Sequence, residues 1–374
     1  MGNKKIIAIV TILVVALLAI NTFFITGFSV KDNKDTINLG SILILSGGEG
    51  SSWGIASKNG IDLAVKDIND GGGINSKKLI VNHQDYQGNP TISINAFRNL
   101  VDVQDIDIII GTTWTPAGLA LKDLARDNKV LMISPSLGVK DFNENSEFLF
   151  NTWPHDYILS KNLADLVYKE GHRKVAMIGA QQPWVKDQTI AFKSRFEELG
   201  GKVEVLVEPL PGETEVTTDA LKIKNAKNID AVVVTSGEYI IGVSVVKRIK
   251  EIGVNLPLYS VTVDNAIIEA SDGAYNDMIF LTSLTPTKDF EQRYKQTFNQ
   301  DIDIGADSAY DAVMMIAEAI EQTGSTNPTA LQEYLNNIKE YNGVSGHLIS
   351  DGKGGFTKDF VMMKVKDGKA VEVN

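Results

Sequence analysis

Short apolar runs alternate with segments of helical periodicity along most of the chain. Ile106–Gly111 is short, rich in β-branched residues and ends in glycine, which predicts a buried parallel strand. Thr115 suits the N-cap of a helix and Pro116 its first turn, and apolar residues then recur at helical spacing. Val130–Ser134 predicts a second buried strand. Together these segments predict one βαβ unit.

Two loops of this unit are candidates for a binding site. Thr112–Thr115 and Ser134–Gly138 follow the carboxyl ends of neighbouring strands, which is where ligands bind in open α/β sheets. Thr112, Thr113 and Thr115 bring hydroxyl groups next to a helix N-terminus, which suits an anion such as a carboxylate. Neither loop contains His, Cys or Lys. The pattern therefore predicts binding and not reaction.

The same alternation extends over both sides of this unit. Further strands are expected at Ile37–Leu45, Lys78–Gln84, Phe148–Thr152, Lys174–Gly179, Lys202–Val207, Ala231–Thr235, Leu258–Val263 and Met278–Ser283. Further helices are expected at Ile55–Ile68, Ile92–Leu100, Ile158–Lys169, Thr189–Leu199, Ile240–Ile252, Ala309–Gln322 and Thr329–Asn337. Alternation of this kind predicts parallel sheets with helices on both faces. Only the tail differs, with a turn-rich stretch at Gly343–Gly355 and a hairpin around Asp367-Gly368.

Length, charge and composition restrict the class of protein. A chain of 374 residues is too long for one ordinary core and suggests two domains. The net charge of −11 disfavours nucleic acid as a partner. The absence of Cys excludes disulfides and thiolate chemistry. Asp301, Asp303 and Asp307 do not fit a calcium loop, because Gly305 stands where an acid belongs and no Glu closes the loop. We expect neither a metal nor a cofactor.

The N-terminus predicts export. Lys4 and Lys5 precede an apolar run, Ile6–Ile20, which resumes weakly as far as Phe28. A cleaved secretory signal and an uncleaved anchor both fit this pattern, and the length favours the anchor. In either case the lysines stay inside and the body is exported. Because no Cys follows the run, lipoprotein anchoring is excluded. Lys31–Asp35 is a short polar linker.

One motif suggests an enzyme. Gly50-Ser-Ser-Trp-Gly54 matches the G-x-S-x-G pattern, in which the nucleophilic Ser lies directly between a strand and a helix. Here the strand ends near Leu45, several residues too early, and none of the four histidines follows an acid in triad order. A hydrolase using Ser52 is therefore a minor alternative, and we expect a protein that is not an enzyme.

The four tryptophans are more informative. Trp53, Trp114 and Trp184 each follow a predicted strand and are expected in loops, and Trp153 lies between the two α/β halves. Core packing is the ordinary role of such residues. However, three rings at the ligand-facing edges of two separate sheets would face one another if the halves closed on a cleft.

An ordered set of short motifs runs from Ile37 to the C-terminus. They are Gly60-Ile-Asp-Leu-Ala64, Ile68-Asn-Asp-Gly-Gly-Gly-Ile74, Asp85 with Gly88-Asn-Pro90, Ile110-Gly111, Ile133-Ser-Pro135, Ala309-Tyr-Asp-Ala312 and Gly343-Val-Ser-Gly346. Each motif is weak alone, but the set resembles the periplasmic-binding-protein type I family. The resemblance is to its branched-chain amino acid and amide-binding branch, the solute receptors of ABC transporters.

The resemblance implies an architecture. Two doubly wound α/β lobes with parallel sheets would be joined by three crossovers, near Thr152, Leu284 and Gly343, and preceded by the apolar N-terminal helix. Residues 1–35 would be the signal or anchor segment with its linker. Residues 36–152 with 285–343 would form the first lobe, and residues 153–284 with 344–374 the second.

The resemblance also implies a ligand site. Thr115 falls at the hydroxyl position that binds a ligand carboxylate, and Ser136 at a position whose backbone helps to hold an ammonium. Trp53 and Trp184 replace aromatic residues that pack on the ligand side chain. The acid that pairs with the ammonium is Glu238 or Asp264, although a strict register puts Thr262 or Val261 there. The complete expected set is Trp53, Thr113, Trp114, Thr115, Ser136, Trp184, Glu238 and Asp264.

The sequence departs from the amino-acid binders at three places. Gly138 stands where they often carry Thr, Gly237 where they often carry Tyr, and Pro183–Asp187 replaces a Tyr-Gly loop. The implied function is an exported, monomeric solute-binding protein that closes on a small polar or zwitterionic molecule, such as a branched-chain amino acid, an amide or a related compound. It would present this ligand to the membrane permease of an ABC importer. The alternative is a membrane-tethered, ligand-sensing receptor domain of the same fold.

Overall fold

The computed structural model describes residues 35–144, 146–237 and 239–373. The predicted signal or anchor segment falls in residues 1–34 and so lies outside the described residues. Within the described part, no helix has the length and apolar character needed to cross a membrane. Ile37–Asn374 forms one compact unit, which contains two large sheets and one small sheet.

The first large sheet has the strand order β2-β1-β3-β4-β5. Its strands are β1 (Thr36–Leu43), β2 (Lys78–Asp85), β3 (Ile108–Gly111), β4 (Leu131–Ser134) and β5 (Leu149–Asn151). The pairs β1–β3, β3–β4 and β4–β5 are parallel. Every residue of β3 and β4 is buried, because helices cover both faces of the sheet.

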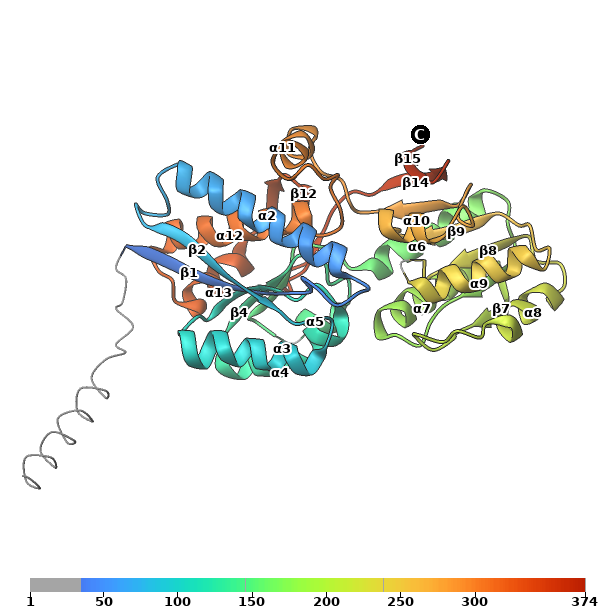
Figure 1. The fold of residues 1–374 in the computed structure, drawn as a ribbon, viewed down its shortest axis with the longest axis horizontal. Helices are drawn as coiled ribbons and strands as arrows, with labels where there is room; N and C mark the ends of the chain where they lie inside the picture. The colour runs from blue at the N-terminus through green and yellow to red at the C-terminus, as the bar shows by residue number, and fades with distance from the viewer. Residues whose placement is uncertain (1–34, 145, 238, 374) are drawn as a thin grey trace, which may run out of the picture. The chain divides into compact units, whose positions relative to one another are not determined.

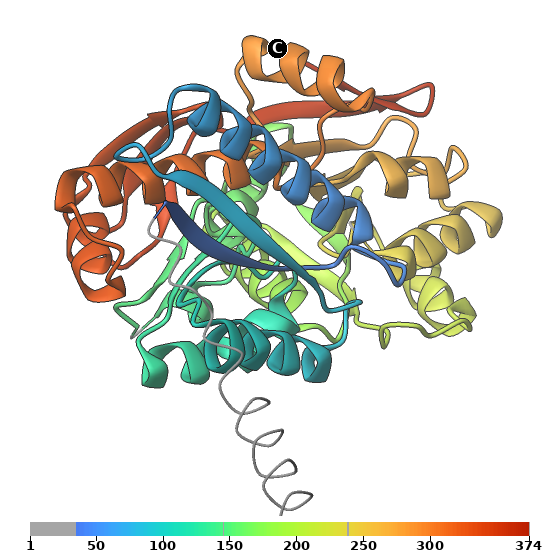
Figure 2. The same ribbon diagram turned by 60° about the vertical axis from the view of Figure 1, so that its left-hand side comes forward.

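Alternating side chains of β3 face two different helical layers. Ile108 and Ile110 pack with α2 (Ser51–Asp70), α12 (Ala306–Thr323) and α13 (Pro328–Asn337). Ile109 packs on the other face with α3 (Pro90–Arg98) and α4 (Thr115–Asn128). Figures 1 and 2 show α2 beside α12, and a Cβ atom at Gly60 would lie 2.0 Å from the carbonyl oxygen of Ala306. Glycine therefore permits this close helix packing.

Around the first sheet there are three further helical elements. They are a π-helical turn at Asn99–Val103, α5 (Lys140–Asn143) and α11 (Lys288–Phe298). Helix α11 is absent from the sequence-based expectation because most of its residues are polar, and Phe290 and Tyr294 are the only buried members of its narrow apolar stripe.

The second large sheet has the order β15-β14-β10-β9-β8-β6-β7. Its strands are β6 (Lys174–Ile178), β7 (Lys202–Val207), β8 (Ala231–Val234), β9 (Leu258–Val261), β10 (Ile279–Thr282), β14 (Val361–Lys366) and β15 (Lys369–Glu372). Strands β6 to β10 pair in parallel, whereas β14 runs antiparallel to β10 and forms the predicted hairpin with β15.

Helices cover the second sheet as well. The buried residues of α6 (Asp156–Lys169) and α7 (Pro183–Glu198) pack together on one face. Those of α8 (Thr217–Asn225) and α9 (Ile240–Glu251) belong to a different cluster with the alternate residues of β6 and β8. A short helix, α10 (Asn265–Ala270), follows β9. The predicted arrangement of two α/β lobes is confirmed.

The chain passes between the lobes at residues 152–155, 283–287 and 358–360. The third passage lies further along than Gly343, where the sequence suggested it. Between the two positions lies a small antiparallel sheet of β11 (Glu340–Gly343), β12 (Gly346–Ser350) and β13 (Phe356–Thr357). Leu348 and Phe356 of this sheet pack into the core of the first lobe. Residues 344–357 therefore associate with the first lobe, although the sequence placed them in the second.

Two helices begin earlier than their apolar period indicates. Helix α2 begins at Ser51 instead of Ile55, and α7 at Pro183 instead of Thr189. The first turns of both helices carry a tryptophan that lines a cavity between the lobes. Because these residues do not face a helix–sheet interface, the apolar repeat starts four residues later in α2 and six residues later in α7.

Candidate functional site

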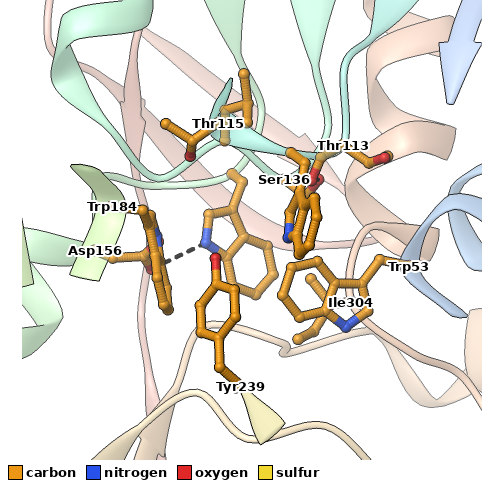
Figure 3. Close-up of a pocket in the computed structure, with 11 residues that line it drawn as sticks. Trp53, Thr113, Thr115, Ser136, Asp156, Trp184, Tyr239 and Ile304 are labelled. Atoms are coloured by element: carbon orange, nitrogen blue, oxygen red, sulfur yellow. Dashed lines mark hydrogen bonds between the residues drawn. The ribbon is translucent and has the colours of Figure 1, made fainter. Parts of the chain in front are cut away.

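A small enclosed cavity of about 10 Å³ lies between the lobes, where the strands of both large sheets end. Figure 3 shows side chains from both lobes converging on it. Its lining consists of Trp53, Thr113, Trp114, Thr115, Ser136, Leu137, Trp153, Asp156, Trp184, Tyr239 and Ile304. The volume corresponds to about one water molecule, so the side chains nearly fill the space themselves.

All four tryptophans of the chain line this cavity. Trp53 and Trp184 lie in the first turns of α2 and α7, and Trp114 is the N-cap residue of α4. The sequence predicted all three in loops. Trp114 does precede its helix, but Trp53 and Trp184 lie inside the first helical turns. Trp153 lies in the first passage between the lobes. Trp53, Trp153 and Trp184 are at most 6% exposed.

Asp156 positions two of the indoles. Trp153 Nε1 donates to Oδ1 at 3.0 Å, and Trp184 Nε1 donates to Oδ2 at 2.7 Å. Burial raises the pKa of Asp156 to about 6, although both hydrogen bonds act in the opposite direction. A Cβ atom at Gly138 would lie 1.6 Å from Oδ2 of Asp156. Glycine at position 138 therefore leaves the space that the carboxylate occupies.

Sequence reasoning missed Asp156 as a lining residue. The one feature of the sequence that pointed to Asp156 was Gly138 in place of the expected Thr, because a side chain at position 138 would occupy the space of this carboxylate. It also missed Tyr239, which directly precedes α9 and contributes from the second lobe. The Tyr239 ring is stacked on Trp114 at 6.0 Å and 23°, and it lies tilted against Trp184 at 5.8 Å and 53°.

Hydroxyl groups of the first lobe line the opposite side. Thr113 Oγ1 accepts from the Ile44 N–H at 3.4 Å, and Ser136 Oγ donates to the Thr113 carbonyl at 3.1 Å. Thr115 is the first residue of α4 and not its N-cap, and no side chain caps this helix. Its side chain is buried at the start of the helix, where the first N–H groups have no acceptor within the helix. This combination suits an anionic group.

The structure brings six expected site residues together around one cavity: Trp53, Thr113, Trp114, Thr115, Ser136 and Trp184. Glu238, the seventh, lies outside the described residues. Asp264 is not part of the lining. Its Oδ1 accepts from the Ile267 N–H and caps α10, and its Oδ2 accepts from Trp53 Nε1, both at 2.7 Å. Both carboxylate oxygens of Asp264 are therefore engaged by the protein.

Two hydrogen bonds connect the lobes next to the cavity. Trp53 of the first lobe donates to Asp264 of the second, and the Ile240 N–H of the second lobe donates to Glu49 Oε1 of the first at 2.9 Å. Burial raises the pKa of both carboxyl groups. These bonds stabilise the arrangement in which the lobes lie close together.

A second space between the lobes is larger and acidic. It measures about 1010 Å³, and Asp264, Asp303, Glu269, Asp272, Glu291 and Asp301 are among its lining residues. Burial, and secondarily the charge of Asp264, raises the pKa of Asp303 to about 7. In the described part of the chain, no three acidic or histidine side chains are grouped closely enough to hold a metal ion.

The geometry contradicts the hydrolase alternative. Ser52 lies inside the first turn of α2, well after β1 ends at Leu43, and its hydroxyl hydrogen-bonds to Asp303. The histidine rings have other partners: His83 bonds Ser41 and Asp62, His155 bonds Asn143, His172 bonds Tyr259, and His347 bonds Asn342. None of these rings is bonded to Ser52, so the pair that a mechanism using Ser52 needs is not formed among the described residues; Ser41, the serine bonded to His83, is fully buried in β1.

Comparisons with known proteins agree with the architecture. A sequence model described as periplasmic binding protein matches residues 36–370. Leu/Ile/Val-binding protein homolog 3 of Brucella melitensis biotype 1 is 30% identical over 171 residues, which covers 45% of this chain and 46% of that protein. The matched part thus spans about half the length of the curated relatives.

Two solved structures share the fold. A leucine-binding protein of Thermotoga maritima MSB8 has a TM-score of 0.82 at 22% identity, covering 91% of this chain and 98% of that one. A branched-chain amino acid transporter substrate-binding protein of Streptococcus pneumoniae, solved with isoleucine, has a TM-score of 0.81 at 23% identity. That match covers 90% of this chain and all of the other. At 22% and 23% identity, these two comparisons establish a shared fold.

Proposed function

The chain belongs to the periplasmic binding protein family, and on this premise we propose that it is the extracytoplasmic solute-binding protein of an ABC importer. It closes two α/β lobes on a small polar or zwitterionic molecule and delivers this ligand to a membrane permease. The observation that carries the proposal is the enclosed cavity between the lobes, which is lined from both of them at the carboxyl ends of their strands.

The geometry supports a mechanism of capture by closure. Trp53 and Trp114 come from the first lobe, and Trp184 and Tyr239 from the second, so separation of the lobes opens the cavity. When the lobes meet, water leaves the site and its polar contacts become stronger. In this mechanism an anionic end of the ligand binds at the N-terminus of α4, beside the hydroxyl of Thr115.

A screen for ligands tests the proposal. Amino acids, amides, small carboxylic acids and amines are added to the protein, and its melting temperature is measured. A ligand that binds only the folded state raises this temperature. The ligand-loaded protein should then stimulate ATP hydrolysis by its permease in proteoliposomes. If none of these compounds binds, the proposal is wrong.

The permease assay also separates transport from sensing. The membrane-tethered receptor alternative stays a prediction, and it requires ligand binding without stimulation of any importer. A protein that binds its ligand but leaves the ATPase rate unchanged would favour that alternative.

Thr115→Val tests the anionic subsite. The substitution removes a hydroxyl while roughly preserving shape, and hydrogen bonds to charged groups are worth about 1.5–3 kcal/mol. We expect a loss of affinity of at least tenfold in calorimetric titrations of the ligand found by the screen. Thr297→Val is a matched control, because the Thr297 hydroxyl bonds only the Arg293 carbonyl of its own helix. Unchanged affinity in Thr115→Val would exclude this hydroxyl as a ligand contact.

A further inference from the structure

Five aromatic side chains surround the cavity, and we call them the aromatic cage. Its members are Trp53, Trp114, Trp153, Trp184 and Tyr239. They come from α2, α7, the first passage between the lobes and the residues that precede α4 and α9. The cores of the two sheets consist mainly of aliphatic residues. Trp184 and Tyr239 also pack against these cores, whereas Trp53 and Trp153 form a separate cluster with Ile304.

Buried carboxylates hold three of the indoles by their edges. Asp156 accepts from Trp153 and Trp184, and Asp264 accepts from Trp53. A carboxylate bonded to the N–H edge of an indole leaves the ring face for other contacts and adds negative potential behind it. The described lining residues include no Lys, Arg or His, and the ammonium of Lys358, which lies 5.3 Å from the centre of the Trp153 ring, is paired with Asp307. The cage is therefore both aromatic and electronegative, which favours a cation.

A primary ammonium is a poor match for this environment. It carries three N–H donors, each of which needs an acceptor when it is buried. Each oxygen of Asp156 and of Asp264 already accepts one N–H of the protein, so a buried ammonium would have to share acceptors that are partly used. A methylated ammonium has no such requirement, because its methyl groups pack on ring faces while its charge is attracted to them from within about 6 Å.

We propose that the ligand carries a quaternary or highly methylated ammonium group, which is bound inside the aromatic cage. This inference rests on the proposed solute-binding function and defines its substrate class. An anionic or polar end of the same molecule would lie toward Thr113, Thr115 and Ser136. Gly138 contributes indirectly, because the space that its missing side chain leaves is filled by the Asp156 carboxylate.

The cation is admitted when the lobes separate. At about 10 Å³ the cavity holds no more than about one water molecule, so the rings must move apart to accommodate a ligand. Trp114 of the first lobe is stacked on Tyr239 of the second with ring centroids 6.0 Å apart. Opening the lobes separates this pair, and a methylated ammonium then lies between two ring faces.

Pairs of isosteric compounds provide the test. Glycine betaine and 3,3-dimethylbutanoate share a shape and a carboxylate, but only the first carries the cation. Choline and 3,3-dimethylbutan-1-ol form a second pair, and tetramethylammonium tests the head group alone. We expect the quaternary compound of at least one pair to bind ten times more tightly than its neutral partner, as measured by calorimetry. Equal affinity within each pair, or no binding of any quaternary compound, would overturn the inference.

Asp156→Asn isolates the contribution of charge. The substitution preserves size and removes the charge, but it also replaces one of the two oxygens that accept an indole N–H, and the affinity for the neutral partner compound measures this structural effect. Affinity for the quaternary compound should fall at least tenfold more than affinity for the neutral compound. If both affinities fall together, the residue has only a structural role and the electrostatic argument is wrong.

The failure of this inference is distinguishable from the failure of the proposed function. Tight binding of leucine or an amide, with no response to quaternary amines, would overturn the cage assignment while leaving a solute-binding protein. The absence of binding to any small molecule would contradict the proposed function itself.

Discussion

Asp303 is a buried carboxyl group that faces a second one across the lobes. It precedes α12 in the first lobe, it is bonded by Ser52 and the Ile304 N–H, and the charge of Asp264 in the second lobe acts on it. Burial, followed by the charge of Asp264, raises its pKa from an ordinary value of 3.8 to about 7. Folding therefore favours the protonated form, and ionisation of Asp303 destabilises the folded protein.

We predict that Asp303→Asn stabilises the protein in a pH-dependent way. Below pH 4 the carboxyl is protonated in both the folded and the unfolded state, so the variant gains little. As the pH rises from about 4 to about 7, the unfolded wild type ionises while the folded group resists, and wild-type stability falls relative to the variant. Above pH 7 the difference should level off at about 2–4 kcal/mol, measured by urea unfolding at a series of pH values.

Asp301→Asn is the matched control for this prediction. Asp301 is largely exposed and pairs with Lys295 on the surface, so its replacement should change stability by less than about 1 kcal/mol at every pH. A constant difference between Asp303→Asn and wild type from pH 4 to pH 8 would contradict the burial of this group in solution.

At the scale of elements, the passage between β13 and β14 contains a buried ion pair. Lys358 Nζ lies 3.4 Å from Asp307 Oδ2 of α12 and 3.1 Å from the Ser345 carbonyl oxygen. The same ammonium lies 5.3 Å from the centre of the Trp153 ring. Neither charged side chain has any exposed surface. Lys358 thus connects α12, the third passage and the first passage at the point where the lobes join.

We predict that Lys358→Met lowers the free energy of unfolding by about 3–5 kcal/mol, because it leaves Asp307 buried without its cation. The double variant Lys358→Met/Asp307→Asn should recover most of this loss, since no unpaired charge remains. Denaturant unfolding of the wild type and both variants measures the effect.

Lys364→Met provides the comparison for the buried pair. Lys364 is 2.8 Å from Asp277, whose side chain is 82% exposed, and a pair of this kind contributes about 0–1 kcal/mol. Equal destabilisation by Lys358→Met and Lys364→Met would show that the buried pair has no special role.

At the scale of the whole molecule, the two lobes belong to one compact unit that begins at Ile37. We predict that a shortened protein beginning at Lys31 is soluble without detergent and has the melting temperature and ligand affinity of the full chain. The reason is that both sheets, and every residue that lines the cavity, lie after this point. Differential scanning calorimetry and ligand titration of both forms provide the measurement. Aggregation or lost binding of the shortened protein would mean that the apolar N-terminus contributes to the fold.

The sequence alone determined the order of elements and the edge of each sheet at which a site could form. Ile108–Gly111 and Leu131–Ser134 are buried on both faces. A strand of this kind is apolar at nearly every position, so its own composition is enough to predict it. Because both strands are parallel, the residues that follow them had to meet at one edge. That rule placed Thr113, Thr115 and Ser136 together without any knowledge of the partner lobe.

Only the tertiary structure decided which side chains complete the site. Asp156 is opposite Gly138, and Asp264 accepts from Trp53 across 211 residues of sequence. Such contacts depend on how the two lobes meet, and no periodic pattern in the local sequence predicts them. For the same reason the first turns of α2 and α7, which face the cavity instead of a sheet, were invisible to the apolar repeat. Periodicity records burial against a neighbouring layer, whereas the cage is created by the approach of two lobes.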